Sequence, residues 1–227
     1  MTCVIFCGGE ISDYEHIRMW PMFGNTSGRQ IEEAGFVISA DSGARHCRML
    51  GIVPDIMVGD FDSVSQNDYE ALIDAGSKAL QYPAEKDMTD SELAVEIAIN
   101  KGFYRVLLFG ATGTRLDHSI SNIFLLKKLT DADIDGIIVN ETSYVRLIKD
   151  EIRLDRVEDA YVTLLPFAGN ALGVSTQGLY YPLDDATLEV GSSWGVSNRF
   201  TEDTACIKLK QGYLLVITHR SEKNFRL

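Results

Sequence analysis

The first part of the chain alternates short apolar runs with polar turns and helix-like segments. Each run is unbroken and closed by glycine or aspartate, which is typical of a buried strand. The expected strands cover residues 3–7, 36–40, 56–58 and 104–109, with a weaker one at 78–82. Helices are expected at 44–50, at about 66–74, behind Thr89, after His118, and starting within 30–34. This alternation predicts an α/β domain with a mainly parallel sheet.

The pattern changes near residue 140, where strands begin to follow one another without helices between them. Gly, Asp, Asn and Pro separate these strands, which is typical of an all-β domain. The expected strands cover residues 143–149, 160–166, 172–176, 186–190, 204–210 and 213–218. The sequence therefore predicts an α/β domain at residues 1–141 and an all-β domain at residues 142–227.

Two aspartates directly follow the third expected strand, in the motif Gly59-Asp60-Phe61-Asp62-Ser63. In an extended segment, residues two apart point the same way, so Asp60 and Asp62 would bring two negative charges into one small volume. Close like charges raise the pKa of one carboxyl group, and a divalent cation such as Mg2+, which takes oxygen ligands, removes that cost. Ordinary turn chemistry is the alternative explanation of this motif.

Other candidate residues also follow expected strands. Asp41 closes the second strand, and residues 110–118, which include Arg115, form a glycine turn between a strand and a helix. Such a turn is typical of phosphate-binding loops, although its spacing is not that of a Walker A loop. The carboxyl ends of parallel strands lie along one sheet edge, so we expect these groups to converge there in a metal–phosphate site.

The motif Lys86-Asp87-Met88-Thr89-Asp90 belongs to the same edge if the chain alternates regularly. Thr89 and Glu92 have capping-box spacing, which makes Asp90 the first residue of a helix. Complementation of the helix dipole is the alternative role of Asp90. That alternative does not account for Asp87 or for the neighbouring Lys86.

Acidic residues outnumber basic ones: 33 Asp and Glu against 21 Lys and Arg give a net charge of -12. DNA and RNA bind to basic surfaces, so nucleic acid is not expected as a partner. No apolar run is long enough to span a membrane and no signal peptide precedes the first strand, so we expect a cytoplasmic protein. The four cysteines have no CxxC spacing and are expected to be free thiols.

Five motifs resemble those of the thiamine pyrophosphokinase family, in the family's order. They are the four stretches at 41–43, 59–63, 86–90 and 110–118, and Gly191-Ser192-Ser193-Trp194-Gly195-Val196-Ser197-Asn198. The resemblance implies transfer of pyrophosphate from ATP to the hydroxyl of thiamine, with Mg2+ as cofactor and release of AMP. It also implies a C-terminal β-sandwich, and a homodimer whose thiamine sites lie between subunits.

The candidate residues take three roles under this interpretation. Catalysis and metal binding are expected of Asp60, Asp62 and Asp90. The nucleotide side is expected to use Asp41, Lys86, Asp87, Arg115, Asp117 and His118. The thiamine side is expected to use Ser193, Trp194, Ser197 and Asn198.

Several of these roles have alternatives. Asp117 would orient Arg115 or cap its helix, and His118 would contact the nucleotide or the metal, or be structural. Ser197 and Asn198 would bind an aminopyrimidine edge or simply form a turn. The sequence does not identify a general base for the thiamine hydroxyl.

Ser42, Thr114 and Trp194 depart from the family's common pattern. Trp194 is expected to border the thiamine pocket through cation–π contact, with packing in the core or the dimer interface as the alternative.

Two other functions fit parts of the sequence. Asp60 and Asp62 also resemble the Asp-x-Asp motif of haloacid-dehalogenase-type phosphatases, in which the first aspartate is a nucleophile that follows the first strand. Here the motif follows the third strand. A module that binds thiamine or nucleotide without turnover is the second alternative, although a pure binder needs fewer acids.

Overall fold

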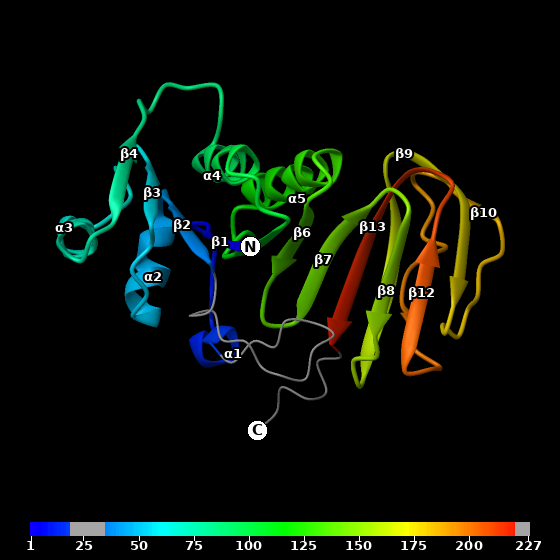
Figure 1. Cartoon of the computed structure of the whole chain (residues 1–227). Helices are drawn as coiled ribbons and strands as arrows, with labels where there is room; N and C mark the ends of the chain where they lie inside the picture. The colour runs from blue at the N-terminus through cyan, green and yellow to red at the C-terminus, as the bar shows by residue number, and fades with distance from the viewer. Residues whose placement is uncertain (19–34, 221–227) are drawn as a thin grey trace. The chain divides into compact units, whose positions relative to one another are not determined.

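The computed structural model describes residues 1–18 and 35–220 of the chain (Figure 1). These residues divide into two compact units, the first ending at Glu141 and the second beginning at Thr142. The helix expected to start within residues 30–34 lies outside the described residues.

The first unit is built on a parallel sheet with the strand order β4-β3-β2-β1-β5-β6. The strands are β1 (Thr2–Phe6), β2 (Phe36–Ala40), β3 (Ile56–Gly59), β4 (Lys78–Gln81), β5 (Arg105–Phe109) and β6 (Asp135–Val139). The chain adds β2, β3 and β4 on one side of β1 and then returns to add β5 and β6 on the other. Such a reversal of strand order is a topological switch point, where open α/β sheets bind ligands beyond the carboxyl ends of the strands.

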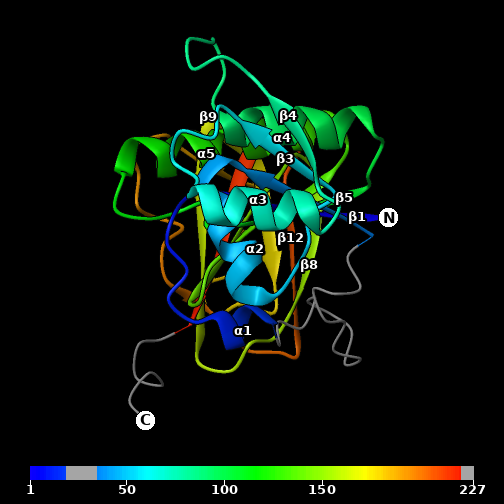
Figure 2. The same ribbon diagram turned by 90° about the vertical axis from the view of Figure 1, so that its left-hand side faces the viewer.

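Helices cover both faces of this sheet. They are α1 (Tyr14–Arg18), α2 (Ala44–Leu50), α3 (Gln66–Asp74), α4 (Asp90–Asn100) and α5 (Leu116–Asp131). Figure 2 shows α4 and α5 on one face and α2 and α3 on the other. The hydroxyl of Thr89 accepts a hydrogen bond from the backbone N–H of Glu92, so the predicted cap at the start of α4 is confirmed.

The expected strands and helices that fall on described residues of the first unit are confirmed, although α5 begins at Leu116, before the expected start after His118. The elements β6 and α1 were not predicted. β6 begins with Asp135 and Gly136, which shortens its apolar run. A Cβ atom at Gly136 would lie 2.6 Å from Cδ1 of Leu129, so glycine is needed at this position for α5 to pack against the strand.

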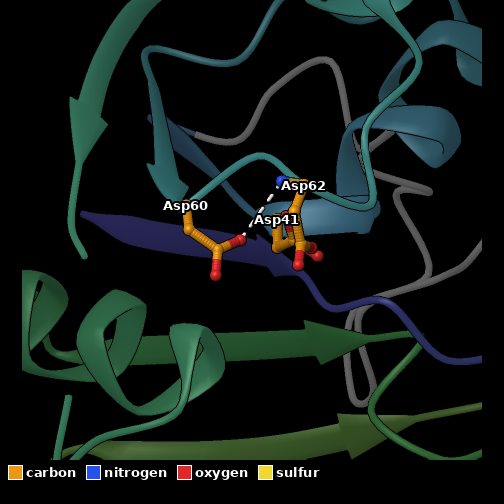
Figure 3. Close-up of side chains that lie close together, drawn as sticks. All are labelled: Asp41, Asp60 and Asp62. Carbon is orange, nitrogen blue, oxygen red and sulfur yellow. Dashed lines mark hydrogen bonds between the residues drawn. The ribbon is translucent and has the colours of Figure 1, made fainter. Parts of the chain in front are cut away.

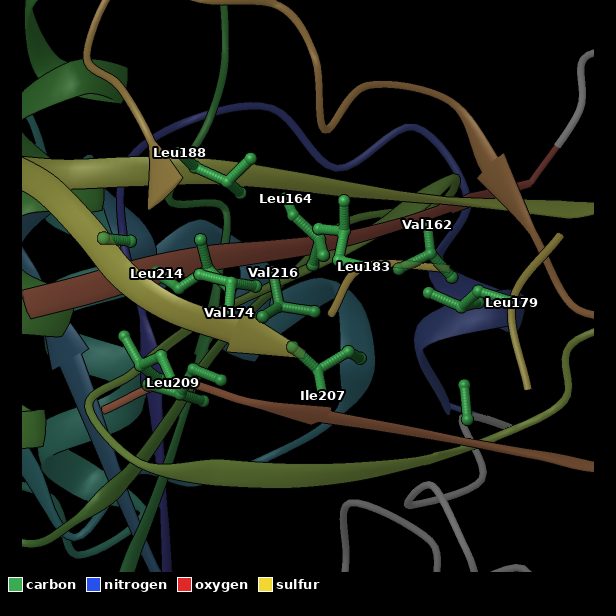
Figure 4. Close-up of a cluster of buried hydrophobic side chains, with 13 residues drawn as sticks. Val162, Leu164, Val174, Leu179, Leu183, Leu188, Ile207, Leu209, Leu214 and Val216 are labelled. Carbon is green, nitrogen blue, oxygen red and sulfur yellow. The ribbon is translucent and has the colours of Figure 1, made fainter. Parts of the chain in front are cut away.

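The described strands of the second unit pair antiparallel to one another. They are β7 (Ser143–Ile148), β8 (Glu151–Asp155), β9 (Ala160–Gln177), β10 (Ala186–Leu188), β11 (Asn198–Arg199), β12 (Thr204–Lys208) and β13 (Gln211–Arg220). The start of β9 pairs with β13, which also pairs with β7, and the end of β9 pairs with β12, which also pairs with β8. Apolar side chains from both ladders, among them Val162, Leu214 and Ile207, form one core (Figure 4). The expected antiparallel β region is confirmed.

Two details of the second unit differ from the sequence-based expectation. Residues 160–166 and 172–176 belong to one long strand, β9, because the chain turns without leaving the sheet at Ala168 (φ 58°) and Gly169 (φ 144°). The strands β8 and β11 were not predicted. β8 has only Ile152 and Leu154 to place against the core, and β11 is two residues long.

Two expectations from composition can be compared with the described residues. Cys3, Cys7 and Cys47 are buried free thiols and Cys206 is a partly exposed one, as expected. Within residues 1–18 and 35–220, no helix combines the length and the apolar character needed to cross a bilayer.

Candidate active site

A cleft of about 580 Å³ lies in the first unit, beyond the carboxyl ends of its parallel strands. Its walls come from the segments that follow β1, β2, β3 and β5 and from the start of α4. The lining includes residues 8–10, 40–42 and 110–115, with Arg45, Asp60, Ser63, Lys86, Asp90, His118, Ser119 and Asn122. This volume is in the usual range for sites that bind small ligands and cofactors.

Three carboxylates gather at this edge of the sheet (Figure 3). One oxygen from each of Asp41, Asp60 and Asp62 lies within 4.8 Å of the others. Asp60 and Asp62 converge for a different reason from the one expected, because the segment after β3 is not extended. Phe61 has a φ of 65°, and the backbone N–H of Asp62 donates to Oδ1 of Asp60 at 3.2 Å. Residues with positive φ are strained and are often found at functional sites.

Asp41 reaches the cluster because β3 ends in a glycine, Gly59. Gly59 has a φ of 153°, and a Cβ atom there would lie 3.1 Å from Cβ of Asp41. Asp41 itself has a φ of 43° and begins a 3-10 turn over Asp41–Gly43. Because of this turn, the carboxylate of Asp41 lies beside those of Asp60 and Asp62 (Figure 3).

The environment of Asp41 fits a cation. Its Oδ1 atom is buried and finds no hydrogen-bond partner among the described residues. Burial raises the pKa of Asp41, the backbone N–H of Ser42 opposes that rise, and the charges of Asp90, Asp60 and Asp62 add to it. A buried, unpartnered oxygen beside other carboxylates is unfavourable alone, and a hard divalent cation, which takes oxygen ligands, would satisfy it. These acids could therefore hold a metal ion.

Asp90 lines the same cleft from the first residue of α4 but is not one of the three clustered acids. Its Oδ1 atom lies 3.1 Å from Nζ of Lys86, and Lys86 also donates to the carbonyl of Pro83 at 3.1 Å. Asp87 is exposed and does not line the cleft. Among the acids named from the sequence, Asp41, Asp60 and Asp62 form the tightest group, and the charge of Asp90 is near enough to raise the pKa of Asp41.

Two glycine turns form the wall of the cleft beside β1 and β5. We call residues 8–10 the first glycine turn and residues 110–113 the second glycine turn. The N–H of Gly9 donates to the carbonyl of Gly110 at 2.7 Å, and the N–H of Glu10 donates to the carbonyl of Thr112 at 3.0 Å. A Cβ atom at Gly9 would overlap both carbonyl oxygens, so only glycine allows the two turns to approach this closely.

The second glycine turn is also tied to α5, which limits the phosphate-binding role expected of it. The N–H of Gly113 donates to Oγ of Ser119 at 3.1 Å, and the buried Asn122 donates to the carbonyl of Ala111 at 2.8 Å. The backbone N–H of Gly113 therefore donates within the protein and is not free to bind a phosphate oxygen. Serine and asparagine on α5 hold the shape of the turn.

Arg115, Asp117 and His118 lie together where α5 begins. Nη2 of Arg115 lies 2.9 Å from Oδ2 of Asp117, and Nε2 of His118 lies 3.8 Å from the same oxygen. Arg115 lowers the pKa of the exposed Asp117. The N-cap of α5 is Arg115 without a side-chain cap, so Asp117 contacts Arg115 and does not cap the helix.

The candidate residues in the second unit form a turn that is fixed to β9. The N–H of Ser197, whose φ is 61°, donates to the hydroxyl of Thr163 at 3.0 Å. Asn198 is 6% exposed, and its side chain holds the backbone of Tyr181, accepting from the N–H at 2.9 Å and donating to the carbonyl at 2.7 Å. Trp194 is 62% exposed, and its backbone N–H donates to the hydroxyl of Ser192. Ser193 is exposed in the same turn.

Reasoning from the sequence missed several residues in the cleft and near the turn of the second unit. Gly8, Gly9 and Arg45 line the cleft, and the only signal in the sequence was a glycine pair after the first strand. Tyr180 and Tyr181 are 57% and 58% exposed and meet edge to face at 4.9 Å between ring centroids.

A parallel sheet with an acid-lined cleft at its switch point is typical of the α/β proteins that bind phosphorylated ligands. Comparison with known protein families identifies the family to which the chain belongs. Residues 28–138 match the family described as "Thiamin pyrophosphokinase, catalytic domain", and residues 149–214 match "Thiamin pyrophosphokinase, vitamin B1 binding domain". The chain belongs to the thiamin pyrophosphokinase family.

Individual relatives agree with this assignment. The chain is 29% identical over 182 residues to a thiamine pyrophosphokinase of Bacillus subtilis, which covers 79% of this chain and 85% of that protein. The crystal structure of thiamine pyrophosphokinase from Bacillus subtilis matches with a TM-score of 0.85 and 26% identity, over 97% of this chain and 100% of the other. The thiamin pyrophosphokinase of Geobacillus thermodenitrificans matches with a TM-score of 0.82 and 26% identity, over 98% and 99% of the two chains.

Proposed function

We propose that this chain is a thiamine pyrophosphokinase, which transfers pyrophosphate from ATP to the hydroxyl group of thiamine and releases thiamine diphosphate and AMP. The observation that carries the proposal is that residues matching the family's catalytic domain build the acid-lined cleft. The match of residues 149–214 to a vitamin B1 binding domain supports thiamine as the acceptor.

The metal-binding and catalytic residues we propose are Asp60, Asp62 and Asp90, as expected from the sequence, together with Asp41, which clusters with the first two. Mg2+ bound there would neutralise phosphate charge and polarise the phosphoryl group under attack. A chain with a net charge of -12 needs this compensation to bind a polyphosphate. The buried Oδ1 of Asp41 supports its inclusion in the set.

Lys86 and Arg115 are the proposed partners of the phosphate oxygens. Phosphoryl transfer depends mainly on positioning and charge neutralisation, so these cations would hold the chain of phosphates in line with the acceptor. The oxygen of the thiamine hydroxyl then forms a bond to the β-phosphorus and releases its proton to solvent. The bond from that phosphorus to the bridging oxygen of the α-phosphate breaks at the same time, and AMP leaves. Asp117 would orient Arg115, and His118 lies beside both.

The thiamine side belongs to the second unit in this proposal. Ser193 and Ser197 supply hydrogen-bonding groups, and Trp194 supplies an exposed aromatic face for the cationic thiazolium ring. Asn198 would act by fixing the backbone of Tyr181, since its side chain is buried in those hydrogen bonds. The division into a catalytic domain at 1–141 and a thiamine-binding domain at 142–227 is part of the same proposal.

We also propose a cytoplasmic homodimer with thiamine bound between subunits. Exposed apolar side chains support an interface. Leu116, Ile120 and Phe124, four residues apart on α5, are 69%, 45% and 54% exposed. Apolar stripes of this kind are unusual on a monomer and mark protein–protein interfaces.

The proposal is tested by incubating the protein with ATP and Mg2+, with and without thiamine, and measuring AMP and inorganic phosphate. A thiamine pyrophosphokinase gives AMP only when thiamine is present. Phosphate release without thiamine would indicate a phosphatase. Binding of both ligands without turnover would indicate a binding module.

A further inference from the structure

Two adjacent residues of α2 hold the first glycine turn: Arg45, which lines the cleft, and His46, which does not. Nη2 of Arg45 donates to the carbonyls of Gly8 and Gly9, at 2.8 Å in both cases. Nε2 of His46 lies 2.9 Å from the same carbonyl of Gly9. Glycine has no side chain that could fix this turn, and its backbone is the most flexible of all residues. Donors from a neighbouring helix are therefore needed to keep this wall of the cleft in one conformation.

The hydrogen bonds of His46 define its tautomer. A backbone carbonyl only accepts, so Nε2 must carry the proton and donate to Gly9. Nδ1 is then the acceptor of the neutral ring, and it lies 2.8 Å from the hydroxyl of Tyr14 on α1, which donates to it. His46 is 1% exposed, and burial lowers its pKa to about 4, in keeping with a neutral ring. The carbonyl of Gly9 thus selects the tautomer, and Tyr14 holds the ring by donating to Nδ1.

His46 also contacts the second glycine turn. A Cβ atom at Gly110 would lie 3.2 Å from Nε2 of His46, so the imidazole packs directly against this glycine. The backbone bonds from Gly9 to Gly110 and from Glu10 to Thr112 join the two turns. A movement of His46 would therefore displace both turns that line the cleft.

We propose that His46, oriented by Tyr14, is a positioning residue that holds both glycine turns in the geometry that binds the nucleotide phosphates. It does not touch the reacting atoms and acts through the carbonyl of Gly9. The inference rests on the proposed function only in naming the nucleotide as the ligand of the cleft.

Two amide substitutions separate positioning from packing. In His46→Gln the amide N–H occupies the place of Nε2 and can still donate to Gly9. In His46→Asn the amide occupies the place of Nδ1, can bond Tyr14, and cannot reach Gly9. We expect His46→Gln to keep the KM for ATP close to that of the unaltered protein. We expect His46→Asn to lower kcat/KM for ATP by about tenfold or more, since small displacements of a positioned group are costly.

Leu129→Ala is the control for loss of stability, because Leu129 is fully buried where α5 packs against Gly136 of β6 and lies outside the cleft lining. It should lower the melting temperature without changing the KM for ATP. Tyr14→Phe, which removes only the hydroxyl, should raise the KM for ATP less than His46→Asn does. A rise in the KM for ATP that follows the loss of melting temperature equally in all variants would overturn the proposal.

The tautomer provides a readout that needs no turnover. Long-range 1H–15N correlation spectra of the unaltered protein should show His46 protonated at Nε2, and Tyr14→Phe should leave the proton there, because the carbonyl of Gly9 only accepts. A proton on Nδ1 in the unaltered protein would also overturn the proposal. If the tautomer is as expected but the protein turns over no ATP, the assigned reaction fails, and calorimetric titration with Mg-ATP still tests the role of His46 in binding.

Discussion

Asp41 is held in an unusual position for a carboxylate. Its backbone has a positive φ, one oxygen is buried without a hydrogen bond from any residue in 1–18 or 35–220, and burial together with three further acids raises its pKa. None of these features contributes to the stability of the metal-free protein. Together they are explained by a cation that binds at this point and offsets the repulsion.

We predict that Asp60→Asn and Asp41→Asn each lower kcat by about a hundredfold or more, since metal ligands supply several kcal/mol of transition-state stabilisation. The melting temperature in a chelating buffer should stay equal or rise, because one of several repelling charges is lost. Mg2+ should stabilise the unaltered protein more than either variant, as measured by thermal unfolding with and without the ion. Asp74→Asn, at the end of α3 and outside the cleft lining, is the matched control. Near-normal activity of Asp60→Asn at saturating Mg2+ would refute the metal assignment.

Trp194 is predicted to contact thiamine. Because the side chain is 62% exposed, Trp194→Ala should change the melting temperature little. A cation–π contact is worth roughly 0.5–2 kcal/mol, so the KM for thiamine should rise several-fold while the KM for ATP stays unchanged. Steady-state kinetics with each substrate varied in turn makes this comparison. A preserved KM for thiamine, together with loss of a dimer, would assign Trp194 to subunit packing.

At the scale of elements, the cleft depends on glycines that permit close contact between segments. Gly110 (φ 60°) and Gly51 (φ 70°) share a left-handed backbone, which costs a side-chain-bearing residue about 1 kcal/mol or more. Their surroundings differ. A Cβ atom at Gly110 would lie 2.6 Å from the carbonyl oxygen of Cys7, whereas one at Gly51 would meet no atom of the described residues within 4 Å.

We predict that Gly110→Ala destabilises the protein more than Gly51→Ala and also raises the KM for ATP, because it displaces the wall of the cleft. Gly51→Ala should lower the free energy of unfolding only by the cost of a left-handed backbone at the end of α2, and it should leave the KM for ATP unchanged. Denaturant unfolding and steady-state kinetics of the two variants test this pair. An equal KM for ATP in both variants would show that the second glycine turn does not contribute to nucleotide binding.

The strands of the first unit could be predicted because buried parallel strands are continuous apolar runs, as β1 and β5 are. The acids could be predicted as a group because Asp41 and Asp60 follow neighbouring strands. The way in which Asp60 and Asp62 come together could not be predicted, because it depends on the left-handed backbone at Phe61. The contact of His46 with Gly9 joins residues 37 apart and leaves no local signal in the sequence.

At the scale of the whole molecule, we predict a homodimer. Leu116 and Ile120 leave an apolar stripe on α5, and a second copy of the chain would bury it. Light scattering at micromolar concentration should give twice the 25.2 kDa mass of one chain. Leu116→Glu should shift this mass towards the monomer, and Met49→Glu, which also replaces an exposed apolar residue, is the control. A single-chain mass for the unaltered protein would contradict the prediction.

The most direct test of the assigned reaction is to follow all phosphorus-containing products by 31P NMR, with ATP, Mg2+ and thiamine present. The account predicts that AMP and thiamine diphosphate appear in equal amounts, that neither forms without thiamine, and that Asp60→Asn forms neither. Accumulation of ADP with thiamine monophosphate, or of inorganic phosphate independent of thiamine, would contradict it.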